Sequence, residues 1–153
     1  MAVPTQIDPR GPRFGAAITA VLLAAALILG PRSTAGFVLL LIQTVAFALG
    51  SLVGLHAQPW GIIFRRVLRP RLGAPSELED ARPPRFAQTV GLAFAVLGVI
   101  GWAASLPILF YIAVGGALFA ALLNALFNFC LGCEIYLWVA RIRGRNVQTS
   151  GGA

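Results

Sequence analysis

Residues 107–140, PILFYIAVGGALFAALLNALFNFCLGCEIYLWVA, decide the fold, because they run for 34 residues with Glu134 as their sole charge. One straight helix of this length would measure about 51 Å, whereas the hydrocarbon core of a bilayer is about 30 Å thick. Two full spans would need about forty residues and a turn. We therefore predict one long helix whose last turns leave the membrane core, with Gly132 as the position of a break.

Three further apolar runs precede this stretch, and each is long enough to cross a bilayer: residues 14–30, 36–55 and 86–104. Hydrophobic residues make up 58% of the chain and charged residues 11%, whereas about a quarter of the residues in soluble proteins are charged. The sequence predicts an all-α membrane protein with four transmembrane helices in a single domain, residues 14–143. We interpret residues 1–13 as a flexible leader, 56–85 as the central loop and 144–153 as a flexible tail.

The arginines predict the orientation. All 12 basic residues are arginines, and only Arg32 lies outside the leader, the central loop and the segment that follows Ala140. With four spans these three segments share a side, so the positive-inside rule places both termini in the cytoplasm. Arginine without lysine, in a chain rich in Ala, Gly and Pro, indicates a bacterial genome rich in G and C, hence a bacterial cytoplasmic membrane. We expect no nucleic-acid partner, because such proteins gather basic residues on a water-exposed face.

Residues 60–69 predict a short amphipathic helix on the membrane surface. Trp60 and Phe64 lie on its apolar face at helical spacing, and Arg65, Arg66 and Arg69 take the other face. We expect the three arginines to contact anionic lipid headgroups. The alternative is a basic loop that only fixes the topology.

Cys130 and Cys133 form a C-x-x-C pair near the predicted cytoplasmic end of the last helix. In one interpretation they are inert small residues in a crowded helix. In a second they form a redox or sulfur-transfer pair, since both sulfurs share one helical face. In a third they bind Zn together with His56 or Glu134, with a homo-oligomer supplying missing ligands. We expect the reduced state in the cytosol and no other cofactor.

Four amide side chains lie within the apolar runs: Asn124, Asn128, Gln43 and Gln88. Asn124 and Asn128 belong to a stripe of small and amide residues at four-residue intervals, which predicts a face packed against neighbouring helices. In a regular helix Cys130 lies about 200° from Asn128, so we expect the thiols to face elsewhere. Alternatively, the four amides line a solute path, which would make the protein a small carrier or transporter subunit.

Three blocks of the chain resemble a known family: PWG at 59–61, ELEDARPPRFAQTVGLAF at 77–94 and LNALFNFCLGCEIYLW at 123–138. They are similar to the hallmark blocks of domain-of-unknown-function family 4395, which comprises small bacterial integral membrane proteins. The resemblance implies a four-helix membrane protein with a C-x-x-C-E element and, as partners, thioredoxin-like or sulfurtransferase proteins. We predict a membrane component, rather than an enzyme, whose cytoplasm-facing thiols assist sulfur or redox partners. The alternatives are the solute carrier and a structural protein with inert cysteines.

Overall fold

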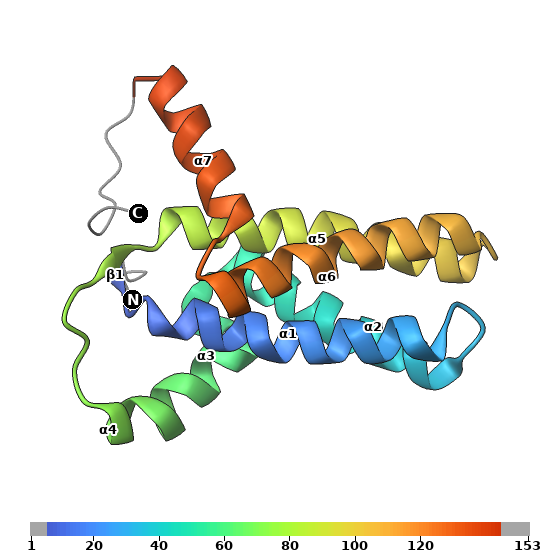
Figure 1. Cartoon of the computed structure of the whole chain (residues 1–153), viewed down its shortest axis with the longest axis horizontal. Coiled ribbons are helices and arrows are strands. Elements are labelled where there is room, and N and C mark those ends of the chain that lie inside the picture. Colours follow the sequence, from blue (N-terminus) through green and yellow to red (C-terminus); the bar gives the residue numbers. More distant parts are fainter. Residues whose placement is uncertain (1–5, 145–153) are drawn as a thin grey trace.

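The fold is a bundle of four long apolar helices in a computed structural model that describes residues 6–144 (Figure 1). Each is long and apolar enough to cross a membrane: Arg10–Leu29, Thr34–Val53, Arg82–Ala103 and Pro107–Phe127. The first, third and fourth are α1, α5 and α6, and the second is α2 (Thr34–Ala48) continued by the π-helical turn η1 (Leu49–Val53). The prediction of an all-α membrane protein with four spans is therefore confirmed.

Local sequence signals explain where the helices start. Pro12 and Pro83 lie in the first turns of α1 and α5, where a missing N–H breaks no helical hydrogen bond. The Ser33 Oγ caps α2 by accepting a hydrogen bond from the Gly36 N–H at 3.1 Å. As a result α1 and α5 begin at Arg10 and Arg82, before the apolar runs from which these two spans are predicted.

Small residues let the helices approach closely around one buried core. α6 packs on α1 and α5, and α2 also packs on both of these helices. A Cβ added to Gly98 would lie 2.8 Å from a Val114 methyl group, and one added to Gly101 would lie 2.6 Å from the Phe110 nitrogen. Leu23, Leu40 and other large apolar side chains fill the space between the helices. Such packing is typical of helices in lipid, where van der Waals contact drives association.

One end of the bundle carries nearly all of the charge. It contains the start of α1, the connection from η1 to α5, and the end of α6 (Figure 1). Every arginine that the structure describes lies on segments at this arginine-rich end except Arg32, which lies in the turn between α1 and α2. The side assigned to this end rests on the positive-inside rule alone.

The central connection is a short helical segment that packs against the bundle. It consists of η2 (Leu55–Ala57), α3 (Pro59–Ile63), η3 (Phe64–Leu68) and α4 (Arg69–Leu72). A helix over residues 60–69 is thus confirmed, but part of its apolar face contacts protein. Phe64 is 2% exposed, and its ring contacts that of Phe14 of α1 in a tilted arrangement, with ring centroids 5.9 Å apart. Ile63 and Val67 stay exposed and remain available to lipid.

Part of the predicted leader is ordered. β1 (Gln6–Ile7) pairs antiparallel with β2 (Glu79–Asp80), and the first turn of α1 begins at Arg10. The Asp8 carboxylate accepts hydrogen bonds from the Arg10 side chain and backbone, which fixes this corner. Residues 1–5 of the leader and 145–153 of the predicted tail lie outside the described residues.

The predicted fourth helix is two helices. α6 ends at Phe127 and α7 (Leu131–Ile142) leaves the bundle in a different direction (Figure 1). Asn128 has a left-handed conformation with φ 54°, which asparagine adopts more readily than most residues and which ends a helix. Arg13 of α1 donates a hydrogen bond to the Ala125 carbonyl at 3.1 Å in the last turn of α6. The break therefore falls before Gly132, and it interrupts the predicted stripe at Asn128.

Candidate functional site

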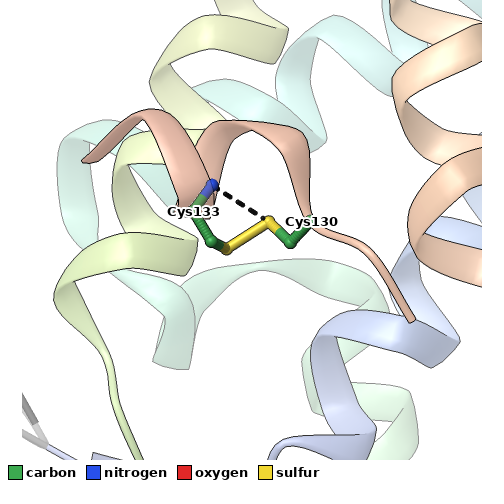
Figure 2. Close-up of a disulfide and its surroundings, with 2 residues drawn as sticks. All are labelled: Cys130 and Cys133. Carbon is green, nitrogen blue, oxygen red and sulfur yellow. Dashed lines mark hydrogen bonds between the residues drawn. A yellow bond between two sulfur atoms is a disulfide. The ribbon is translucent and has the colours of Figure 1, made fainter. Parts of the chain in front are cut away.

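The C-x-x-C pair lies in the first turn of α7, outside the four spans. Cys130 and Cys133 are joined by a disulfide with their Cα atoms 5.1 Å apart, as Figure 2 shows. This separation lies within the usual range for disulfide-bonded cysteines. The sequence predicts reduced thiols, and here the structure differs, because the cysteine side chains lie on one side of the turn within bonding distance.

Cys130 caps α7 instead of lying inside a helix. Its backbone is extended, with φ −85° and ψ 102°, and its Sγ accepts a hydrogen bond from the Cys133 N–H at 3.2 Å (Figure 2). The predicted angle of about 200° between Asn128 and Cys130 does not apply, because both residues lie in the break. Free N–H groups and the helix dipole favour negative charge at a helix N-terminus, including a thiolate. Sequence reasoning that assumes a continuous helix misses this cap.

α7 is held mainly by α5. A Cβ on Gly132 would lie 2.7 Å from the Ala87 Cα, so the two backbones are nearly in contact here. Further along, the rings of Phe86 and Tyr136 are 5.7 Å apart. The opposite face carries exposed apolar side chains, among them Trp138, which is 65% exposed. The disulfide thus lies on a helix with one packed face and one face open to lipid or a partner.

An apolar cavity of about 240 Å³ lies beside the disulfide, between α1, α5, α6 and the start of α7. Cys130 lines it together with two of the predicted amides, Gln88 and Asn124. The Gln88 Oε1 is buried and has no hydrogen-bond partner within residues 6–144. A polar group of this kind is costly in an apolar site unless something satisfies it.

The other two predicted amides lie elsewhere. Gln43 is fully buried, and its Oε1 accepts a hydrogen bond from the Trp60 Nε1 at 3.1 Å. This hydrogen bond links α3 of the central connection to α2. Asn128 is exposed at the end of α6. Only Gln88 and Asn124 of the four amides share the cavity.

A second, larger cavity of about 600 Å³ opens at the arginine-rich end. Its wall includes His56, Arg65 and Arg69. Arg66 does not line this cavity in the part of the chain that the structure describes. Pro12 and Gln88 line both cavities, so the two are neighbours. Of the three arginines predicted to act together, the structure therefore separates Arg66 from the other two.

The predicted zinc ligands do not assemble within one chain. No group of three or more His, Cys, Asp or Glu side chains in the described range could hold a metal ion. His56 lines the larger cavity, whereas Cys130 lines the smaller one and is bonded to Cys133. Glu134 is exposed in the first turn of α7. A zinc site from these residues would need a reduced pair and ligands from a second chain.

Comparison with known proteins supports the resemblance of the sequence blocks. The family model described as a domain of unknown function (DUF4395) matches residues 7–141. No curated protein and no solved structure matches this sequence. The family match runs from β1 through all four spans and nearly all of α7, so it includes the disulfide at the start of α7. The chain therefore belongs to the DUF4395 family.

Proposed function

We propose that this membrane protein is a dithiol–disulfide exchange component in which Cys130 attacks and Cys133 resolves. The observation that carries the proposal is the position of the pair at the start of α7. There Cys130 accepts the Cys133 N–H, and both sulfurs are within bonding distance of one another. A thiol that caps a helix gains thiolate character, and the thiolate is the nucleophile in exchange.

The exchange has two steps. The Cys130 thiolate attacks one sulfur of a partner disulfide, which forms a mixed disulfide and releases the other partner sulfur as a thiolate. The Cys133 thiolate then attacks the Cys130 Sγ, forms the Cys130–Cys133 disulfide and releases the second partner sulfur. The partner gains two electrons and the pair loses two. The same steps in reverse return the pair to its reduced form.

The partner in this proposal is a soluble cytosolic protein. The pair lies at the arginine-rich end, which the positive-inside rule assigns to the cytoplasm of a bacterial inner membrane. Thioredoxin-like and sulfurtransferase proteins carry the disulfides or sulfane sulfur that such a pair could exchange. The exposed face of α7 next to the disulfide gives them access.

Trapping of the mixed disulfide tests the proposal. The Cys133→Ala variant lacks the resolving thiol, so Cys130 should hold a partner as a covalent adduct on a non-reducing gel, and reductant should release it. Cys130→Ala is the matched control, and it should trap much less because its remaining cysteine does not cap α7. Wild-type cysteines that alkylate slowly and independently, with no adduct in either variant, would establish that the pair is inert.

The carrier remains a second candidate because Gln88 and Asn124 line the apolar cavity. A carrier should keep its solute flux in proteoliposomes when both cysteines are replaced by alanine. Replacement of Gln88 and Asn124 by leucine should abolish that flux. Flux that depends on the cysteines would instead favour the exchange function.

A further inference from the structure

We infer that the 600 Å³ cavity at the arginine-rich end is a binding site for a tetrahedral oxyanion, a phosphate or sulfate group. This inference goes beyond the exchange function and does not depend on it. The anion has two sources in a cell: a free inorganic ion or the headgroup of an anionic lipid. The shared chemistry is a compact group with several acceptor oxygens, which arginine forks and amide N–H groups bind well.

Two segments of the chain bring arginines to the cavity. η3 and α4 carry Arg65 and Arg69, and the first turn of α5 carries Arg82 and Arg85. The two segments are held in place by other contacts. Phe64 packs on α1 next to Gly11, and the Arg85 guanidinium donates hydrogen bonds to carbonyl groups at the end of η1. The wall is therefore built by the fold and is not a set of independent surface side chains.

The carboxylates on the wall are already paired. Asp8 accepts two hydrogen bonds from the Arg10 side chain, and Asp80 accepts hydrogen bonds from Arg82. Four arginines face two aspartates among the described lining residues, which leaves a net charge of +2. Arg69 lies 3.9 Å from Asp8, a carboxylate that Arg10 holds more closely. The cavity thus has positive charge that its own carboxylates do not neutralise.

The surroundings of Arg65 show this excess of positive charge. Its guanidinium donates a hydrogen bond to the His56 carbonyl at 2.7 Å, and it has no carboxylate partner in the part of the chain that the structure describes. Partial burial and the positive charges of Arg66 and Arg69 lower the pKa of Arg65. An anion in the cavity would relieve both the burial cost and the repulsion.

An amide donor on a largely buried side chain points to the same kind of ligand. Gln58 lines the cavity and is only 6% exposed. Its Oε1 accepts the Gly61 N–H at 2.7 Å, which identifies the other terminal atom as the Nε2 donor. That Nε2 makes no hydrogen bond within residues 6–144. The side chain is mostly buried, but this donor is not one of the fully buried unpaired atoms, so it is open to the cavity, where an oxyanion would supply the acceptor.

The test measures anion binding by the full chain in nanodiscs of zwitterionic lipid. Inorganic phosphate and sulfate are titrated by calorimetry against chloride of equal ionic strength. The cavity variant is Arg65→Gln with Arg69→Gln. The control variant is Arg66→Gln with Arg71→Gln, which removes the same charge from neighbouring positions outside the wall. In parallel, native mass spectrometry measures retention of phosphatidylglycerol by protein purified from membranes that contain it.

Saturable binding of phosphate or sulfate, weakened roughly tenfold or more in the cavity variant and within about twofold of wild type in the control, would support a free oxyanion. Retention of one anionic lipid by wild type and control, with loss in the cavity variant, would support a headgroup. Absence of both kinds of binding in wild type, or equal losses in the two variants, would overturn the inference.

If the double variant does not fold, the single variant Arg69→Gln tests the anion site. Arg69→Gln removes only the 3.9 Å ion pair with Asp8 and no hydrogen bond that the structure gives. It should weaken anion binding at least threefold relative to Arg71→Gln. Equal affinities of these two single variants would overturn the inference as well. None of these variants changes Cys130 or Cys133, so all of them should still trap a partner. The trapping assay and the binding assays therefore test the two proposals separately.

Discussion

Replacement of Gly132 by alanine should displace α7 from α5. The added Cβ would lie 2.7 Å from both the Cα and the Cβ of Ala87. Carbon atoms pack at about 3.5–4.0 Å, so α7 must retreat by roughly 1 Å or the start of α5 must shift. Overpacking of this kind lowers the free energy of unfolding by about 1–3 kcal/mol. The better helix propensity of alanine raises it by about 0.5–1 kcal/mol. The difference is a net loss of about 0–2.5 kcal/mol, with its midpoint near about 1 kcal/mol.

Chemical unfolding of the purified protein in mild detergent measures this loss. Gly115→Ala is the matched control, because a Cβ at Gly115 meets nothing within 4 Å, and this variant should be as stable as wild type or slightly more so. Ala87→Gly in the Gly132→Ala background removes one of the two clashing atoms and should recover part of the stability. A Gly132→Ala protein as stable as Gly115→Ala would refute the close packing of α7 on α5.

Three further predictions concern the rest of the chain. A periplasmic phosphatase fused after residue 75 should be inactive if the arginine-rich end faces the cytoplasm, and an active fusion would refute that topology. The hydrogen bond from the Arg10 guanidinium lowers the pKa of Asp8 below its usual 3.8, so the carboxylate stabilises the fold above that pH. This contribution should be lost only as pH falls below about 4, and Asp8→Asn should remove that part of the pH dependence of unfolding. Asn128→Gly should leave stability nearly unchanged because glycine accepts a positive φ, whereas Asn128→Val should cost about 1–2 kcal/mol in the same unfolding assay.

Hydropathy was sufficient to predict the four spans, because a bilayer imposes length and apolarity on every helix that crosses it. It could not reveal the end of α6, since residues 124–133 carry no charge through the break. The break depends on the left-handed conformation of Asn128, and asparagine adopts that conformation only in certain contexts. The cap formed by Cys130 follows from the break, so it was missed for the same reason.

The separation of the arginines was also beyond sequence reasoning. Arg65 and Arg66 are neighbours with the same side chain, and a helical pattern places both on the polar face. In the fold Phe64 packs on α1, Arg65 lines the large cavity, and Arg66 does not. The pattern could show that the segment is amphipathic, whereas the fold determines which charges face inward.

The attachment of α7 has a consequence for how the molecule opens. Most contacts of α7 are with α5, and few are with α6, to which residues 128–130 connect it. A helix docked along one neighbour unfolds or detaches at lower free energy than a bundle whose members each contact two others. The backbone amides of α7 should therefore exchange with deuterium as one group, ahead of the amides in the middle of α1, α5 and α6. Such an opening would widen the access of a large soluble protein to the disulfide, which is already partly exposed, while the long helices of the bundle keep their packing.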